Sequence, residues 1–91
     1  MKEDIEKNLR QVEGWNLVGN AIEKNYTFHN FKQAVEFINK VADLAEEENH
    51  HPDILLWSWN NVKITLTTHS VKRPSSKDFV LASRIDQIKP E

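Results

Sequence analysis

The sequence predicts one α+β domain in which three helices and two β-hairpins follow the order α-ββ-α-ββ-α. Two observations carry this prediction. Two stretches of strand-forming residues are each folded about a pair of turn-forming residues, and each is followed by a segment with helical periodicity. We therefore expect residues 1–91 to form a single domain, an α+β sandwich whose four-stranded antiparallel sheet has its helices packed on one face.

Composition narrows the class of protein. The chain has no cysteine, which excludes disulfides and thiolate metal sites. Its net charge of −2 argues against a nucleic-acid-binding surface, which needs a basic excess. The first residues are charged and no apolar run approaches the length of a membrane span, so we expect a cytoplasmic protein without membrane contact.

The first third of the chain predicts a short helix and a hairpin. An amphipathic helix is expected within residues 1–13, and Gly14 can end it. Its apolar residues at helical spacing are Ile5, Leu9 and Val12. Residues 15–18 and 21–28 then flank Gly19-Asn20, a pair typical of a two-residue hairpin turn.

The strongest periodic signal predicts a helix over residues 31 to about 48. Asn30 is a typical N-cap, and Gln33 three residues later completes a capping box. Because a proline disfavours the α conformation in the residue before it, Pro52 places His51 beyond the helix. The apolar stripe of this helix is predicted to be Phe31, Ala34, Val35, Ile38, Val41, Ala42 and Ala45.

A second hairpin is expected next. Residues 53–59 are apolar and aromatic, and residues 62–68 alternate apolar with polar side chains. The pair Asn60-Asn61 suits the turn between them, because asparagine tolerates positive φ. In this interpretation Trp57 and Trp59 share one strand face, where they are more typical of a core or a subunit interface than of a ligand platform.

The last helix follows a loop at residues 70–74. Ser75 is its expected N-cap, and Asp78 at the third helical position can complete a capping box, which gives that carboxylate a structural role. Pro90 closes the chain. The buried stripe of this helix is predicted to be Phe79, Ala82, Ile85 and Ile88.

Three of the four histidines are the main candidates for chemistry. His50 and His51 follow the long helix, and His69 ends the fourth strand. An imidazole has an ordinary pKa of about 6.5, so it can donate or accept a proton near neutral pH. A protonated and a neutral histidine together suffice for an elimination, in which one proton is added to a leaving hydroxyl and one is removed nearby.

Each of these histidines also fits a purely structural role. A histidine pair at a helix end is more often a surface feature, and a histidine at a strand end often only satisfies a backbone carbonyl. A metal site built from His50, His51 and His69 is a further alternative, but it lacks the spacings of the familiar histidine zinc motifs. His29 has no assigned role.

A spaced set of residues resembles the signature of the pterin-4a-carbinolamine dehydratases: Glu46, His50, His51, Pro52, Trp59, His69 and Asp78. The resemblance covers roughly residues 14–88. Members of that family commonly have an aromatic residue where this chain has Ile54, and glycines where it has the 70–74 loop. The spacing of the signature is kept across both departures.

The resemblance implies the α+β sandwich and an enzyme that dehydrates 4a-hydroxytetrahydrobiopterin to quinonoid dihydropterin without a metal or an organic cofactor. It further implies a homodimer or homotetramer, and an aromatic amino acid hydroxylase as the source of the substrate. The alternative is a non-catalytic pterin- or protein-binding module of the same fold, such as an accessory factor in molybdopterin metabolism.

The resemblance also assigns residues. His50, His51 and His69 are the implied catalytic residues: the first and third exchange protons at the 4a-hydroxyl and the ring nitrogen, and the second holds the pterin. Glu46 and Asp78 support the site. The implied substrate-binding residues are Asn49, His50, His51, Pro52, Thr68, His69 and Ser70.

Overall fold

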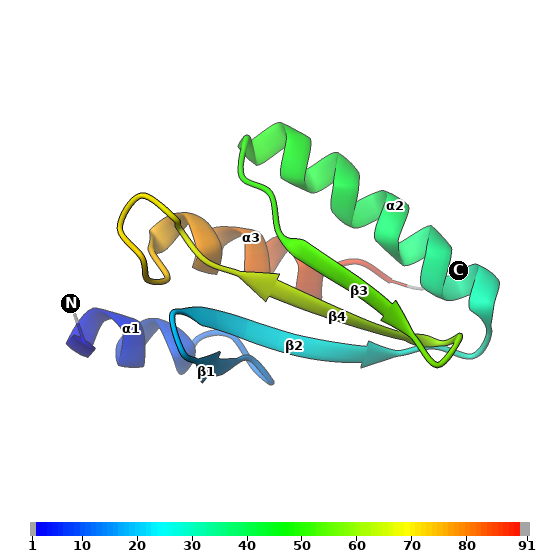
Figure 1. Ribbon diagram of the computed structural model, residues 1–91, viewed down its shortest axis with the longest axis horizontal. Coiled ribbons are helices and arrows are strands. Elements are labelled where there is room, and N and C mark those ends of the chain that lie inside the picture. The colour runs from blue at the N-terminus through cyan, green and yellow to red at the C-terminus, as the bar shows by residue number, and fades with distance from the viewer. Residues whose placement is uncertain (1, 90–91) are drawn as a thin grey trace.

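The element order of the structure is α-ββ-α-ββ-α (Figure 1), so the predicted fold class is confirmed. The computed structural model describes residues 2–89, with side chains from residue 5 onward. Met1 and Pro90, at the two ends of the prediction, lie outside the described residues. The elements are α1 (Lys2–Leu9), β1 (Asn16–Val18), β2 (Ala21–Thr27), α2 (Phe31–Glu48), β3 (Asp53–Trp57), β4 (Asn61–Leu66) and α3 (Ser76–Asp86).

The strands form one antiparallel sheet in the order β1-β2-β4-β3, with α2 and α3 against one face (Figure 1). The first hairpin turns at Gly19-Asn20 as predicted, because Val18 pairs with Ala21. The strands β1 and β3 are the two edges of the sheet. Within residues 2–89, none of the helices combines the length and the apolar character that crossing a membrane requires.

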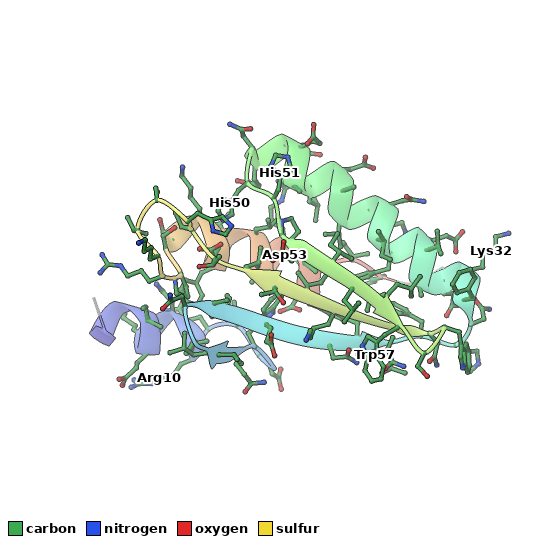
Figure 2. All side chains as sticks on the ribbon, viewed as in Figure 1. Arg10, Lys32, His50, His51, Asp53 and Trp57 are labelled. Atoms are coloured by element: carbon green, nitrogen blue, oxygen red, sulfur yellow. The ribbon has the colours of Figure 1, made fainter. Side chains whose placement is uncertain are left out.

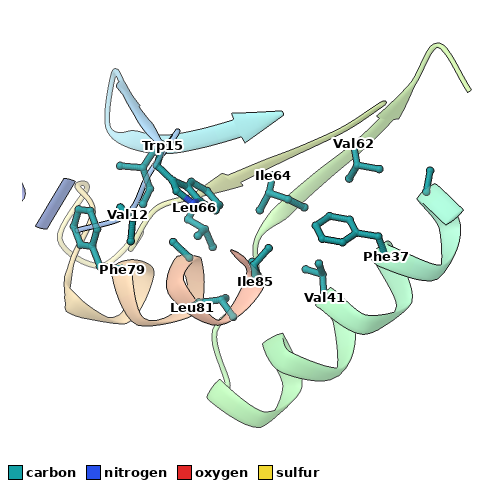
Figure 3. Packing of buried hydrophobic residues seen from close by; sticks show 13 residues of the cluster. Val12, Trp15, Phe37, Val41, Val62, Ile64, Leu66, Phe79, Leu81 and Ile85 are labelled. Carbon is teal, nitrogen blue, oxygen red and sulfur yellow. The ribbon is translucent and has the colours of Figure 1, made fainter. Parts of the chain in front are cut away.

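The core lies between the sheet and the two longer helices (Figure 3). The alternation of β4 buries three side chains completely and turns Lys63 and Thr65 to the other face. Phe37 of α2 contacts the rings of Tyr26 and Phe28. The labelled members of this core in β4, α2 and α3 are Val62, Ile64, Leu66, Phe37, Val41, Leu81 and Ile85.

The helix α2 has the predicted bounds, and Ala34, Val41 and Ala45 of the predicted stripe are buried, but the buried face is shifted relative to the rest of that stripe. Phe31 is 55% exposed and Ala42 is also exposed, whereas Phe37 is buried and Leu44 is half-buried. With 3.6 residues per turn, two neighbouring lines of apolar residues compete for the core, and only contact with the sheet and α3 selects one. At the N-terminus, Asn30 accepts from the Gln33 N–H at 2.8 Å, as expected of an N-cap.

The first helix is shorter than predicted. It ends at Leu9 rather than near residue 13, because the chain turns so that Val12 and Trp15 enter the core, where each is only 5% exposed. Gly14 follows with a φ of +83°, a conformation that favours glycine.

The predicted turn at Asn60-Asn61 is wrong. Trp57 pairs with Asn61, so residues 58–60 form the turn, and positive φ falls on Ser58 (47°) and Trp59 (58°). Trp59 therefore leaves the strand and does not share a face with Trp57. Its side chain is 59% exposed.

The hydrogen bonds of Asn60 account for the position of this turn. Its backbone oxygen accepts from the Phe28 N–H at 2.8 Å, and its side-chain amide donates to the Phe28 oxygen at 2.8 Å. These bonds attach the turn to the connection between β2 and α2, which holds Asn60 outside the ladder. That partner is 32 residues away, so no local pattern could reveal it.

Candidate active site

The end of α2 is fixed by its own backbone. Asn49 is left-handed (φ 50°, ψ 43°), and its N–H donates to the Glu46 oxygen at 3.2 Å. The His50 N–H donates to the Ala45 oxygen at 3.1 Å. This pair of bonds is the Schellman arrangement, in which asparagine can replace the usual glycine. The helix thus stops at Glu48, and His50 leaves it in a defined direction.

The loop between β4 and α3 is closed by a short antiparallel bridge. The Thr68 N–H donates to the Arg73 oxygen at 3.2 Å, and Lys72 within the loop has a φ of 55°. Pro74 is buried and directly precedes Ser75. The bridge therefore brings Thr68, at the end of the sheet, beside the first turn of α3.

His50 contacts Asp78 where the end of α2, the end of β4 and the first turn of α3 meet, a place called the corner below. The Nε2 atom of His50 lies 2.5 Å from Oδ1 of Asp78, whose side chain is fully buried, while that of His50 is 13% exposed. The other oxygen, Oδ2, accepts from the Thr68 hydroxyl at 2.7 Å and from the Ser75 N–H at 2.8 Å. The bond from Ser75 is the predicted half of the capping box, so Asp78 both starts α3 and holds an imidazole.

His51 points elsewhere. Its Nε2 lies 2.5 Å from Oε2 of Glu46, and both side chains are largely exposed, at 59% and 76%. Figure 2 shows His50 turned toward the α3 side and His51 against the end of α2. The two neighbouring histidines thus have different carboxylate partners in different surroundings.

The remaining predicted site residues lie on the same two segments. His69 and Ser70 are exposed in the turn after β4, and the His69 imidazole makes no hydrogen bond to another described side chain. Asn49 is exposed and Pro52 is half-buried beside the histidine pair. The structure thus brings the side chains of His50 and Thr68 onto the two oxygens of Asp78, and it leaves His51 and Glu46 as a separate pair.

Two signature-related positions lie away from this corner. Trp59 belongs to the turn after β3, and Figure 2 shows Asp53 and Trp57 at opposite ends of that strand, so Trp59 is separated from His50 by its length. Ile54 pairs with Ile64 and packs against the core. Trp59 is therefore not placed to stack on a ligand held at His50, and Ile54 has no aromatic ring to stack.

Sequence reasoning missed Ser75 as a neighbour of the candidate site. It identified Ser75 only as an N-cap, but its hydroxyl lies 2.7 Å from that of Thr68. The capping signature could locate the start of α3, yet nothing local indicated which side chains would face it.

No group of three or more histidine and acidic residues that could hold a metal occurs within the described residues. Two hollows, of about 370 and 390 Å³, lie where α1 and the segment before α3 meet α3 itself. Neither lining contains a histidine, although Ser75 lines the second hollow.

A family model described as pterin 4 alpha carbinolamine dehydratase matches residues 1–88. The chain belongs to this family. A protein of Sulfurisphaera tokodaii with the provisional name pterin-4-alpha-carbinolamine dehydratase is 42% identical over 87 residues, which cover 96% of this chain and 92% of the relative. A protein of Herpetosiphon aurantiacus with the same provisional name is 45% identical over 87 residues, covering 96% and 90% of the two chains.

Two solved structures are also similar. A transcriptional coactivator/pterin dehydratase from Brucella melitensis matches with a TM-score of 0.89 at 30% identity, covering 94% of this chain and 93% of the other. A pterin dehydratase-like protein identified as a RuBisCO assembly factor in the alpha-carboxysome matches with a TM-score of 0.64 at 25% identity, covering 79% and 82%. The fold of this pterin dehydratase-family chain is thus shared with proteins described in quite different terms.

Proposed function

We propose that this chain dehydrates 4a-hydroxytetrahydrobiopterin to quinonoid dihydropterin and water, with histidines as the acid and the base. The observation that carries the proposal is the contact between His50 Nε2 and the buried Asp78, in a chain that belongs to the family named for this reaction. A carboxylate bonded to one imidazole nitrogen fixes the orientation and the tautomer of the ring. His50 is thereby held as a proton carrier.

The reaction needs only an acid and a base. The carbon–oxygen bond of the carbinol breaks, and the hydroxyl leaves as water after it receives a proton. The neighbouring ring nitrogen loses a proton as its double bond to carbon forms, so atoms and charge balance and nothing is oxidised. No metal or organic cofactor enters this scheme.

In our proposal His50 and His69 exchange these two protons, and His51 holds the pterin. His69 directly follows Thr68, whose hydroxyl donates to the same Asp78 that His50 contacts. Asn49 and Pro52 flank the histidine pair and Ser70 follows His69. These three residues are proposed to line the substrate, and Glu46 orients His51 across their 2.5 Å contact.

The test is a pterin-dependent hydroxylase assay in which the decay of the carbinolamine absorbance is followed. We expect the protein to accelerate the decay, and His50→Ala and His69→Ala each to lower turnover by about 10²–10⁴-fold, the usual range for general acid–base groups. His29→Ala is the matched control, because His29 is an exposed histidine outside the site. Unchanged rates in both site variants would contradict the assigned roles.

A non-catalytic pterin- or protein-binding module is the second candidate, of which an accessory factor in molybdopterin metabolism is one form. The observation that favours it is the likeness to the pterin dehydratase-like protein that serves as an assembly factor. A protein that binds the pterin, or a protein partner, without accelerating the decay of the carbinolamine would support this candidate.

The source of the substrate and the assembly also stay predictions. An aromatic amino acid hydroxylase is the expected source, and a homodimer or homotetramer the expected assembly. Light scattering on the purified protein measures its mass in solution, and a monomer would contradict the second expectation.

A further inference from the structure

The carboxylate of Asp78 uses both of its oxygens, and they face different groups. Oδ1 faces His50, while Oδ2 accepts from the Thr68 hydroxyl and the Ser75 N–H. Its side chain is fully buried, so water does not compete for these positions. Whatever fixes Oδ2 therefore also fixes the direction in which Oδ1 points.

The hydroxyl of Ser75 extends this arrangement by one step. It lies 2.7 Å from Oγ1 of Thr68, and geometry alone allows either oxygen to be the donor. A hydroxyl carries a single proton, and that of Thr68 is donated to Asp78. Ser75 must therefore donate to Thr68. The result is a series of hydrogen bonds that all run in one direction, from Ser75 to Thr68 to Asp78.

We propose that Ser75 is a positioning residue for His50. Its hydroxyl fixes the rotation of the Thr68 hydroxyl, Thr68 holds Oδ2 of Asp78, and Oδ1 then keeps the Nε2–H of His50. Nδ1 is left as the ring nitrogen that exchanges a proton with a substrate. The effect of these hydrogen bonds on turnover rests on the proposed function, whereas their effect on the tautomer of His50 does not.

The surrounding backbone restrains the groups that form this series of hydrogen bonds. The bridge between Thr68 and Arg73 fixes Thr68, and the buried Pro74 leads directly into Ser75. The N–H of Ser75 independently caps α3 through Asp78. The capping box of α3 also involves the side chain of Ser75, so the capping role and the positioning role are separated by comparing variants that lose the hydroxyl with and without loss of the cap.

The variants are chosen to make that separation. Ser75→Ala removes the hydroxyl and weakens the cap, whereas Ser75→Gly removes the hydroxyl but keeps most of the capping preference. Ser75→Thr retains a hydroxyl and is the rescue variant. Ser76→Ala is the matched control, because Ser76 is an exposed neighbour that lies outside the chain of hydrogen bonds.

The first measurement is the nitrogen NMR spectrum of the His50 ring, at a pH where the ring is neutral. We expect the wild-type protein, Ser75→Thr and Ser76→Ala to show the Nε2-protonated tautomer, and Ser75→Ala and Ser75→Gly to show a mixture. A wild-type tautomer that is unchanged in both hydroxyl-free variants overturns the proposal, whatever their melting temperatures are.

The second measurement is turnover. Outer hydrogen-bond partners of metal-bound histidines contribute about 10–100-fold, and we expect kcat to fall by about tenfold in Ser75→Ala and Ser75→Gly with KM unchanged. Equal loss in Ser75→Thr would indicate a steric effect and contradict the proposal. If the wild-type protein shows no turnover, the proposed function fails while the NMR measurement still decides the role of Ser75.

Discussion

The helix α3 has one aspartate in its first turn and another at its end, and each accepts hydrogen bonds from distant parts of the chain. The two carboxylates differ in the donors that they receive. Asp78, in the first turn, is fully buried and bonds His50, Thr68 and the Ser75 N–H. Asp86, in the last turn, has a side chain 24% exposed. It accepts from Trp15 Nε1 at 3.0 Å, Lys24 Nζ at 2.8 Å and the Tyr26 hydroxyl at 2.5 Å.

Their positions on the helix account for the difference. Asp78 lies at the positive end of the helix dipole, so neutral donors and one imidazole suffice to hold it. Asp86 lies at the negative end, where a carboxylate is unfavourable, and the ammonium of Lys24 offsets this. One carboxylate therefore faces a group that can change its protonation, and the other fastens α3 to β2 and to the segment before β1.

The largest effect is expected from Asp78→Asn. An amide cannot accept from His50 and Thr68 as the carboxylate does, so the ring loses its fixed tautomer. We expect the dehydration rate to fall by about 10²–10⁴-fold, the range of general acid–base catalysis. Single-turnover kinetics with the purified carbinolamine measure this loss.

Asp43→Asn is the matched control, because Asp43 is exposed on α2. A normal dehydration rate in Asp78→Asn would contradict the assignment of Asp78 to the site and of Asp86 to stability alone.

Removing the second carboxylate should affect stability instead. In Asp86→Ala the buried Trp15 loses its indole acceptor and Lys24 its counter-charge, and an unsatisfied buried donor costs about 1–3 kcal/mol. Urea denaturation should show this decrease in the free energy of unfolding, with turnover of the folded protein unchanged. A loss of turnover without loss of stability would mean that Asp86 also acts in the site.

The Asp86 cluster also predicts a pH dependence. Burial, and then the hydrogen bond to Asp86, raise the pKa of Tyr26 above its ordinary value of about 10. The folded protein keeps the phenol proton while the unfolded chain loses it, so this contribution to stability is present below pH of about 10 and is lost as the pH rises further. Because Tyr26 is the only tyrosine, tyrosinate absorbance in an alkaline titration reports on it alone.

We expect tyrosinate to appear together with unfolding. The decline in stability should be shallower in Tyr26→Phe, which has no phenol to ionise. Tyrosinate that forms in the folded protein near its ordinary pKa would show that the cluster does not hold the proton.

The smallest effect is expected at the exposed pair. His51 and Glu46 have the same 2.5 Å separation as His50 and Asp78, but they lie in solvent. Exposed ion pairs contribute about 0–1 kcal/mol to stability. Glu46→Gln should therefore lower the free energy of unfolding by no more than this amount. A larger decrease in a denaturation experiment would indicate that this pair is less exposed in solution, for instance beneath a second subunit.

Local signals predicted most of the secondary structure and part of the candidate site. The bounds of α2, the turn at Gly19-Asn20 and the cap at Asn30 each depend on residues within a few positions of one another. The turn after β3 was predicted wrongly because Asn60 bonds to Phe28, a partner outside its own hairpin. Asp86 had no local signal, since its three donors all lie in the first third of the chain.

The sequence by itself determined the fold class and, through a spaced set of residues, the family. Periodicity and capping reflect hydrogen bonds that span three or four residues, so they can be read along the chain. Only the tertiary structure decided that His50 faces Asp78, 28 residues away, while His51 turns to Glu46. That choice depends on where α2 stops and where the Thr68–Arg73 bridge places α3, and packing fixes both together.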